Sequence, residues 1–550
     1  MTTLPNRNAL ENRYSDDWRQ WSDPDVPEYF NPMQPLFLKH AKTSTWSKTA
    51  LLEDGKFYSY AQLYEKVCQT AEGLISVGLE TEDRLLLFGS DSLEYLSTWL
   101  GSVAAGIIPA VVSDLYKSNN LLYFLRDTSA KALFINEEQL SKLMEVQSQL
   151  PETLKYVIVD SKNSNLKDVS LGASIRIFTY KELIKNEVVT FEPIKRHRND
   201  MAYMFYSGGT TGKAKGIVHL MHDFYLVPER QGAFWDYTEN DICLATSKKY
   251  FTHGLWPGVL MPLYFGGISV ITLQPMSIEQ LIKLINRDKP TTLITVPTII
   301  KNLLQYCKET GEYPDFSSLR MVVTASEKIP LQLFDEFYDV FGLELLDSIG
   351  SSEITYEWIA NRPKDFKRGS LGKPVFGIEV KLIDEEGHEV TEADVPGEAW
   401  VKSETTSLFY WRKFTQTKET FIGEWTRTND ILHFDSDGYY WYNSRSDDQF
   451  KVKGLWVSPI EIEAEIMNVS SVLETAVVPF KTEEGMIEIK ACVVLRPGYV
   501  PSEELTNEIK QSVRKIGGYK VPNIVKYMDS LPRTTLSKID RKSLRNINIK

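Results

Sequence analysis

The sequence predicts an α/β protein in which a large N-terminal domain of mostly parallel sheets flanked by helices carries a small antiparallel β subdomain. A small α+β domain follows at the C-terminus. Two observations carry this prediction. Short β-branched or aromatic runs alternate with helical stretches over the first two thirds of the chain, and after about residue 370 the strands become shorter, alternating and separated by charged turns.

The length and composition fit this class. A chain of 550 residues is several times longer than a usual domain, so at least two cores are expected. Its 42% hydrophobic, 12% aromatic and 25% charged residues exclude long disorder, collagen and coiled coil as the main architecture. The 62 basic and 74 acidic residues give a net charge of −12, which repels phosphate polyanions, so no nucleic-acid partner is expected.

The four cysteines Cys68, Cys243, Cys307 and Cys492 are too few and too scattered for a disulfide framework or a zinc cluster, and we expect reduced core thiols. The N-terminal segment lacks the basic start and apolar run of a signal peptide, which makes the cytoplasm the default location. Glycines and prolines interrupt both weakly charged stretches, residues 95–113 and 251–274. They therefore indicate buried core rather than membrane spans.

The elements follow in order. Residues 82–113 show a strand-like block, a turn, a helical period and a second strand-like block, which is a βαβ signature. Further strands of the parallel sheet are expected at 132–135, 155–160, 201–207, 268–273, 291–296 and 320–326. Antiparallel strands are expected at 378–384, 397–403 and 438–444. The C-terminal lobe should contain helices at 460–470 and 502–516 and strands at 475–480 and 489–495.

The most informative segment is YSGGTTGKAKG, residues 206–216, directly after the strand-like MAYMF. Its glycines let backbone N–H groups approach an anion, the threonines add hydroxyl donors, and Lys213 and Lys215 add charge. The composition of this segment indicates a phosphate-binding loop, although a polar surface loop is the alternative. It is not a Walker A loop, because Ser207 stands five positions before Gly212 and Ala214 follows Lys213.

Three further segments hold candidate polar groups. DSIGSSE, residues 347–353, ends in a carboxylate suited to magnesium, although Ser-Ser-Glu is also a common helix cap. Residues 423–454 contain Asp430, Arg445 and Asp447, for which solvated turn positions are the alternative. Lys538 lies in LPRTTLSKIDRKSLR, which alone reads as a basic tail.

In this order and spacing, the four segments resemble the adenylate-forming superfamily of acyl-CoA synthetases, peptide-synthetase adenylation domains and luciferases. The resemblance covers nearly the whole chain. Within the superfamily, YFTHGLWPGVLMPLYFGG, SIGSSEITYEWIANRP, RGSLGKPVFGIEVKLID, GEWTRTNDILHFDSDGYYWY and SDDQFKVKGLWVSPIEIEAEI look most like the benzoate-CoA ligase branch.

The resemblance implies an ATP and Mg²⁺ site. The phosphate loop would face the β- and γ-phosphates through Thr210, Thr211 and backbone amides. Ser352 and Glu353 would contact the α-phosphate and magnesium, and Asp430 would take the ribose hydroxyls with help from Arg445. The implied nucleotide-binding residues also include Ser207, Gly208, Gly209, Gly212, Lys215, Ala325, Ser326, Glu327 and Asp347, the last near the adenine amine.

The resemblance also implies two half-reactions in one site. Lys538 would bridge the acid's carboxylate and the α-phosphate during adenylation, where an ammonium stabilises the gathering negative charge. Residues 447–550 would form a mobile lobe that turns at Asp447 relative to residues 1–446. Lys453 and Gly454 would then line a tunnel for coenzyme A. One departure from the family pattern is Asn429, which stands before Asp430 where a glycine is usual.

For the acid, the resemblance implies a pocket near His253, Ile349, Gly350 and Tyr356. Amino-acid-activating relatives usually place an aspartate in the segment that here reads YFTHG, and this chain has none there. The aromatic surroundings suit a flat ring, although they read equally as core. The expected substrate is therefore a benzoate-like acid, with the particular acid open because the branch pattern favours histidine where Tyr356 stands.

Three alternatives stay open at this point. The protein could load an acyl group onto a carrier protein in trans, or it could be a medium-chain fatty acyl-CoA synthetase. The non-enzyme alternative is a silent adenylate-binding scaffold, against which Lys538, Glu353 and Asp430 argue. The assembly is expected to be a monomer or a homodimer, without a membrane partner.

Overall fold

The computed structural model describes residues 24–161, 170–172, 174–185, 191–207, 213–326, 328–446, 450–452, 455–482, 486–534 and 539–547. The chain forms two compact units. The first contains the described residues up to 207 together with 213–380 and 401–426, and the second contains those of 381–400 and 427–547. The domain boundary proposed at residue 447 lies outside the described residues and stays a prediction.

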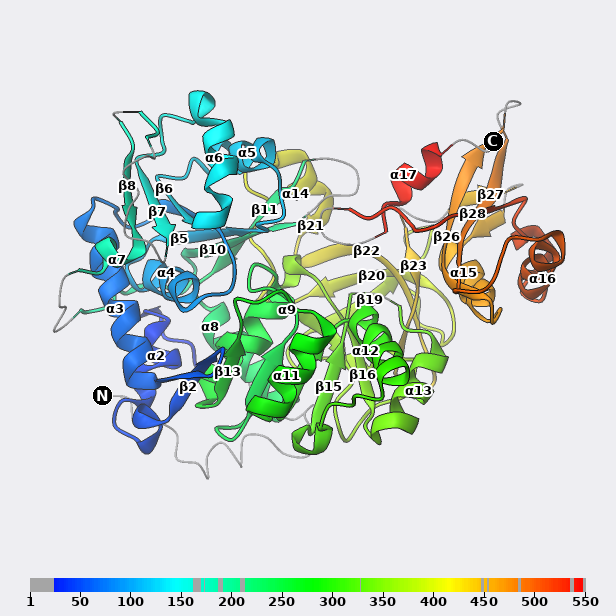
Figure 1. Ribbon diagram of the computed structural model, residues 1–550, viewed down its shortest axis with the longest axis horizontal. Helices are drawn as coiled ribbons and strands as arrows, with labels where there is room; N and C mark the ends of the chain where they lie inside the picture. The colour runs from blue at the N-terminus through cyan, green and yellow to red at the C-terminus, as the bar shows by residue number, and fades with distance from the viewer. Residues whose placement is uncertain are drawn as a thin grey trace. The chain divides into compact units, whose positions relative to one another are not determined.

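One sheet of the first unit has seven strands, in the order β11-β10-β5-β4-β6-β7-β8 (Figure 1). All its neighbours pair in parallel except β10 and β11, which are antiparallel. The predicted βαβ unit is present as β4, helix α4 (Leu93–Ala104) and β5. The strands are β4 (Arg84–Phe88), β5 (Ile108–Val112), β6 (Ala132–Asn136), β7 (Tyr156–Asp160), β8 (Arg176–Thr179), β10 (Met201–Ser207) and β11 (Lys215–Leu220).

A second sheet has nine strands, in the order β18-β17-β16-β15-β14-β12-β13-β2-β3. Its six central strands, β16 to β2, are parallel, and antiparallel strands close both edges. The strands are β2 (Thr49–Glu53), β3 (Lys56–Ser59), β12 (Ile242–Ala245), β13 (Ile268–Ile271), β14 (Thr292–Thr295), β15 (Met321–Thr324), β16 (Leu345–Gly350), β17 (Glu357–Ala360) and β18 (Lys373–Pro374). The pair β1 (Tyr29–Phe30) and β9 (Arg196–His197) forms a separate ribbon.

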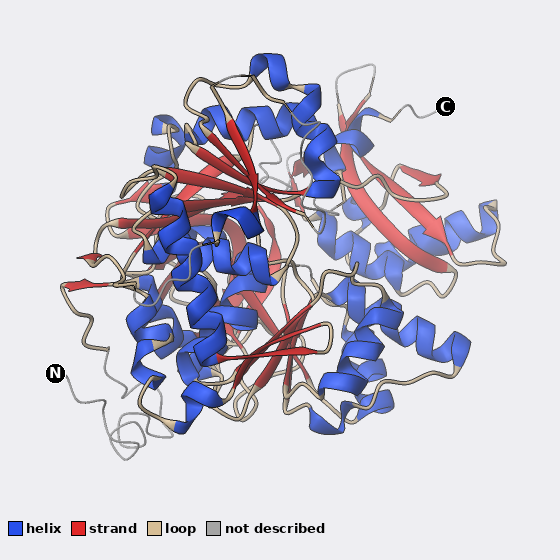
Figure 2. Ribbon diagram, turned by 60° about the vertical axis from the view of Figure 1, so that its left-hand side comes forward, coloured by secondary structure: helices blue, strands red, loops and turns tan. Residues whose placement is uncertain are grey.

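Helices lie on either side of these sheets (Figure 2), as expected for parallel strands that are buried on both faces. One continuous core joins residues of both sheets to α3 and α4, where α4 is buried on nearly all sides. A second core packs α11, α12 and α13 on the nine-stranded sheet. The helices are α3 (Tyr60–Ser76), α5 (Ser118–Thr128), α6 (Leu140–Glu145), α8 (Asp223–Val227), α9 (Thr252–Leu255), α10 (Met261–Phe265), α11 (Ile278–Asp288), α12 (Pro297–Thr310), α13 (Leu331–Phe341) and α14 (Phe414–Thr420).

The predicted antiparallel texture after residue 370 is confirmed by a five-stranded sheet in which β19-β20-β22-β21 are neighbours and β23 pairs with β22. The long strand β22 was not predicted, because WTRTNDILHF mixes polar and apolar residues on both faces. The strands are β19 (Glu379–Ile383), β20 (Gly397–Lys402), β21 (Phe421–Ile422), β22 (Trp425–Phe434) and β23 (Tyr440–Arg445).

The C-terminal part has the predicted α+β character. Strands β26 and β27 pair antiparallel, β27 and β28 pair in parallel, and α15 and α16 pack on them around a core of their own. The elements are β24 (Phe450–Val452), β25 (Leu455–Val457), α15 (Pro459–Met467), β26 (Val472–Lys481), β27 (Ile487–Leu495), α16 (Glu503–Arg514), β28 (Ile524–Tyr527) and α17 (Arg541–Asn546).

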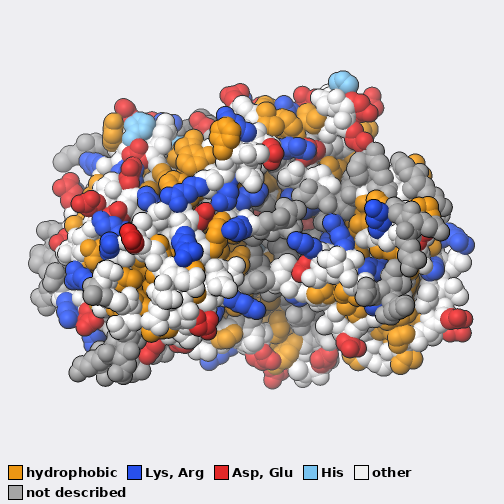
Figure 3. All heavy atoms as spheres, turned by 90° about the horizontal axis from the view of Figure 1, so that it is seen from above, with side chains coloured by type: hydrophobic (Ala, Val, Ile, Leu, Met, Phe, Trp, Pro, Cys, Tyr) orange, Lys and Arg blue, Asp and Glu red, His pale blue; other side chains and the backbone are white. Residues whose placement is uncertain are grey.

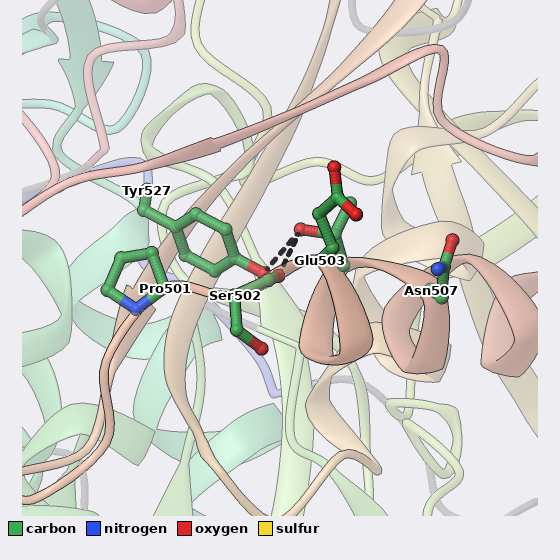
Figure 4. A pocket seen from close by; sticks show the side chains of 6 residues that line it. Pro501, Ser502, Glu503, Asn507 and Tyr527 are labelled. Atoms are coloured by element: carbon green, nitrogen blue, oxygen red, sulfur yellow. Dashed lines mark hydrogen bonds between the residues drawn. The ribbon is translucent and has the colours of Figure 1, made fainter.

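A surface hollow in this C-terminal part is lined by Pro501, Ser502, Glu503, Asn507 and Tyr527 (Figure 4). Its polar groups already serve the fold. The Ser502 hydroxyl caps α16 by accepting from the amide of Leu505 at 3.1 Å, and the Thr506 and Tyr527 hydroxyls lie 3.0 Å apart. We therefore place no site there.

Three expectations about the whole chain can be compared with the structure. The four cysteines are buried and free, and burial raises the pKa of the Cys68 thiol to about 11. None of the described helices is long and apolar enough to cross a membrane. On the face drawn in Figure 3, Lys and Arg side chains lie interspersed with acidic and apolar ones.

Candidate active site

The predicted phosphate loop lies in the sequence between two antiparallel strands, β10 and β11. Ser207 ends β10, Lys215 begins β11, and the two residues are paired in register. Gly208, Gly209, Thr210, Thr211 and Gly212 lie outside the described residues. A Walker A loop leads from a strand into a helix, whereas this loop leads from strand to strand, which agrees with the exclusion made from spacing.

Glu353 lies on a short 3₁₀ turn, Ser352–Ile354, that follows β16. The Tyr410 hydroxyl donates to Glu353 Oε1 at 2.7 Å, and the amide of Ser407 donates to the Glu353 carbonyl at 2.7 Å. The same tyrosine ring lies 4.4 Å below the Lys215 ammonium. The structure therefore brings the predicted lysine of the loop and the predicted magnesium ligand to one tyrosine that the sequence did not single out.

A buried network of hydrogen bonds fixes the 3₁₀ turn that carries Glu353. His219 on β11 donates from Nε2 to the Ser352 carbonyl at 2.7 Å, and its Nδ1 lies 3.2 Å from Asp223 Oδ2. Thr355 donates to the Thr405 carbonyl at 2.6 Å and has a φ of +78°, a strained value for a β-branched residue. Such strain persists only where neighbours fix the backbone, so the turn is rigidly positioned.

Asp347 and the predicted adenine-side residues meet at the carboxyl ends of neighbouring strands. Thr324 ends β15 and pairs with Asp347 on β16. Ala325 and Ser326 follow directly, with Ala325 buried and Ser326 exposed at a φ of +79°. Burial raises the pKa of Asp347 well above its usual range, and the charge of Glu357 adds to this effect. In open α/β sheets this edge is the usual place of ligand binding.

The second unit holds Asp430 and Arg445, which face each other across β22 and β23. Arg445 Nη1 lies 3.7 Å from Asp430 Oδ1, and Asp430 is 7% exposed. Asn429 has a φ of +61°, in the left-handed region where glycine is usual and asparagine is tolerated. Asn429 therefore keeps, before Asp430, the left-handed backbone conformation for which the family's glycine is suited.

The residues implied for the acid pocket lie around His253 on α9. The Tyr356 hydroxyl is 3.3 Å from His253 Nδ1, and the Tyr356 ring packs edge-on against Trp235 at 5.7 Å. Ile349 and Gly350 end β16, where Ile349 is half-buried and Gly350 is exposed. Two aromatic side chains, Tyr356 and Trp235, thus lie beside His253, whereas Trp256 packs with Tyr203 and Phe224 in the core.

Sequence reasoning missed a carboxylate in this group. Glu357 begins β17, and its Oε1 lies 3.3 Å from His253 Nδ1. The available signal was that Glu357 is the one charged residue in YEWIA, residues 356–360. The predicted site residues Glu327, Asp447, Lys453, Gly454 and Lys538 lie outside the described residues, and their roles stay predictions.

The residues fit a magnesium ion that is shared with a nucleotide. Glu353 offers a carboxylate on a fixed turn, where the Tyr410 hydroxyl donates to its Oε1. In the described part of the chain, no group of three or more His, Cys, Asp and Glu side chains could hold a metal alone. Mg²⁺ commonly uses one or two carboxylates together with substrate phosphates and water.

The α/β sheets, the predicted phosphate loop between paired strands β10 and β11, and the C-terminal α+β part are together typical of an adenylate-forming enzyme. Residues 37–411 match the AMP-binding enzyme family and residues 461–538 match the AMP-binding enzyme C-terminal domain, so the chain belongs to this family. Among its relatives is the benzoate–CoA ligase of Thauera aromatica, which is 31% identical over 95% of this chain and 97% of its own.

Two solved structures are similar over nearly the whole chain. The anthranilate CoA ligase AuaEII, in complex with anthranoyl-AMP, has a TM-score of 0.84 and 32% identity, with 95% of this chain and 98% of its own covered. A benzoate CoA ligase from Burkholderia xenovorans LB400 has a TM-score of 0.83 and 28% identity, with 94% and 100% covered. The predicted fold class and the benzoate-CoA ligase branch are thereby confirmed.

Proposed function

We propose that the protein activates a benzoate-like carboxylic acid with ATP and transfers the acyl group to coenzyme A, giving an aryl-CoA, AMP and pyrophosphate. The observation that carries this proposal is the 31% identity to a benzoate–CoA ligase over 95% of the chain. The aromatic side chains of Tyr356 and Trp235 beside His253 support an aryl substrate, because flat rings pack well against aromatic edges.

In the first half-reaction, a carboxylate oxygen of the acid attacks the α-phosphorus of ATP. The new oxygen–phosphorus bond forms as the bond to the β-phosphate bridge breaks, and pyrophosphate leaves. No general base is needed, because the acid is already ionised at neutral pH. Lys538 would hold the two approaching anions together, and Thr210, Thr211 and the loop amides would bind the leaving phosphates.

Glu353 would hold Mg²⁺, which when bound neutralises phosphate charge that builds up during the reaction. The chain's own contribution is the fixed position of that carboxylate. Tyr410 holds one of its oxygens, and the His219 hydrogen bond to the Ser352 carbonyl fixes the turn that carries it.

In the second half-reaction, the sulfur of coenzyme A attacks the carbonyl carbon of the acyl-adenylate. A carbon–sulfur bond forms, the bond to the phosphate oxygen breaks, AMP leaves, and the thiol proton passes to solvent. Residues 447–550 would turn at Asp447 between the two steps. This rotation would move Lys538 out of the active site and place Lys453 and Gly454 beside the tunnel through which coenzyme A enters.

The test is to incubate the protein with ATP, Mg²⁺ and a panel of acids, with either coenzyme A or a phosphopantetheinylated carrier protein, and to identify the products by mass spectrometry. We expect aryl-CoA and AMP from benzoate-type acids. Product on the carrier protein alone would move the acceptor assignment to the carrier. An activity that rises with alkyl length and is weak on benzoates would contradict the aryl assignment.

A further inference from the structure

A buried carboxylate oxygen lies in the wall of the proposed acid pocket without a partner. Glu357 is 4% exposed, and its Oε2 has no hydrogen-bond partner among the described residues. Buried polar atoms are nearly always hydrogen-bonded, and an unpaired carboxylate oxygen is costly. An unpaired acceptor of this kind is expected where a ligand supplies the donor.

The neighbours of Glu357 define what this oxygen can do. His253 Nε2 lies 3.0 Å from the Thr295 carbonyl, which only accepts, so Nε2 carries a hydrogen. The 3.3 Å contact between His253 Nδ1 and Glu357 Oε1 then needs one hydrogen, which belongs either to the histidine or to Oε1. In both cases Oε2 is an acceptor, and the Tyr356 hydroxyl, 3.3 Å from the same Nδ1, competes for the contact that Oε1 makes.

Because Gly350 has no side chain, there is room for Glu357 Oε2 beside the end of β16. Gly350 and Glu357 are paired in register, and a Cβ placed on Gly350 would lie 2.6 Å from Glu357 Oε2. Any side chain at position 350 would therefore collide with the carboxylate. Because Gly350 itself is exposed, Oε2 lies directly behind the exposed end of the strand.

We propose that Glu357 is a specificity-determining residue whose Oε2 accepts a hydrogen bond from an amino or hydroxyl substituent on the ring of the aryl acid. The inference rests on the proposed function and narrows it to amino- and hydroxy-substituted benzoates. A substituent on a ring fits better than the α-ammonium of a free amino acid, because the aromatic side chains of Tyr356 and Trp235 pack beside this carboxylate and suit a flat ring.

The first test uses the wild-type protein and matched acids. At each of the three ring positions, amino-, hydroxy- and methyl-substituted benzoates are compared by kcat/KM for acid-dependent pyrophosphate release. The methyl group matches the amino group in size but donates no hydrogen bond. We expect the amino or hydroxy acid to exceed the methyl acid at one position by about tenfold to a hundredfold.

The second test is Glu357→Leu, which keeps the volume and removes the acceptor. We expect the ratio of kcat/KM between the preferred acid and its methyl analogue to fall at least about tenfold. Glu344→Gln, at a partly exposed ion pair with Arg368 before the same strand, is the control and should leave the ratio unchanged.

The outcomes separate the two proposals. If methyl analogues equal the amino and hydroxy acids at every position, or if E357L leaves the ratio unchanged, the role of Glu357 is wrong while aryl activation stands. If no aryl acid is activated, the proposed function fails first, and activation of free amino acids would assign Oε2 to an ammonium. The wild-type comparison decides the question even if E357L does not fold.

Discussion

Asn429 illustrates how one residue can depart from a family pattern without a change in local structure. Its φ of +61° is the conformation for which glycine is best suited, and it directly precedes Asp430. Asparagine tolerates this region because its short polar side chain bonds locally, whereas β-branched residues do not.

Asn429→Val should therefore destabilise the protein by about 1–2 kcal/mol and lower activity by displacing Asp430, because a β-branched side chain resists the left-handed conformation. Asn429→Gly is the matched control and should change stability by less than about 1 kcal/mol. Denaturant midpoints and pyrophosphate exchange measure both effects. A valine variant as stable and active as the glycine variant would contradict this account.

Lys538 is assigned to adenylation alone, which can be tested at the same scale. Lys538→Ala should lose acid-dependent pyrophosphate exchange by about a thousandfold or more, because the ammonium would no longer bridge the two anions. The variant should still convert supplied acyl-adenylate and coenzyme A to thioester. Lys542→Ala, nearby in the sequence, is a control that should keep both activities. Equal loss of the two steps in K538A would refute the role.

At the scale of elements, the strand predictions succeeded where apolar runs are short and buried. Strands β6, β7, β10, β13, β14 and β15 were expected within one or two residues of their bounds, and β4 and β5 were expected as the two strands of a βαβ unit. Strands β11 and β22 were not predicted, because His219 interrupts the short apolar run of KGIVHL and polar residues interrupt WTRTNDILHF. The pairing of β10 with β11 is therefore seen only in the structure, although the loop between them is the clearest motif in the sequence.

The end of strand β7 contains a carboxyl group that couples folding to pH. Asp160 Oδ2 accepts from Ser92 Oγ at 2.8 Å and from Asn136 Nδ2 at 3.0 Å. Burial, together with the charge of Glu94, raises the pKa of Asp160 to about 7. The folded state therefore keeps a proton that the unfolded state loses near pH ~4, so this group's contribution to stability falls as pH rises from about 4 to 7.

Asp160→Asn should remove this dependence, because the amide stays neutral and its oxygen can keep both hydrogen bonds. We expect the variant to gain on the order of 2 kcal/mol over the wild type at pH 8 and to match it near pH 4. Denaturant unfolding at both pH values measures this difference. Asp339→Asn, exposed on α13, is the control. A constant difference at all pH values would rule out the titration of Asp160 as the cause.

At the scale of the whole molecule, the chain forms two compact units, and each contributes predicted nucleotide contacts. Asp347, Ser352 and Glu353 belong to the first, and Asp430 and Arg445 to the second. The proposed turning of residues 447–550 would let one site run two reactions in sequence, because the groups needed for adenylation and for thiol transfer differ.

Asp447→Pro tests this turning, since proline fixes φ and restricts the rotation that a hinge needs. Pyrophosphate exchange should stay within about twofold of the wild type, while thioester formation from supplied acyl-adenylate should slow by about tenfold or more. Asp447→Ala, which leaves φ free, is the control. Wild-type thioester rates in D447P would show that the lobe does not turn at this residue.

The sequence alone determined the fold class, because buried strands follow from local composition and spacing, and the reaction class followed from its resemblance to the adenylate-forming superfamily. Only the tertiary structure decided which distant side chains meet. Glu357 lies against His253, 104 positions away, and His219 bonds the Ser352 carbonyl, 133 positions away. These contacts depend on strand order and register, which local residue preferences do not specify. For that reason an aromatic pocket could be expected from the sequence, but the carboxylate in its wall could not.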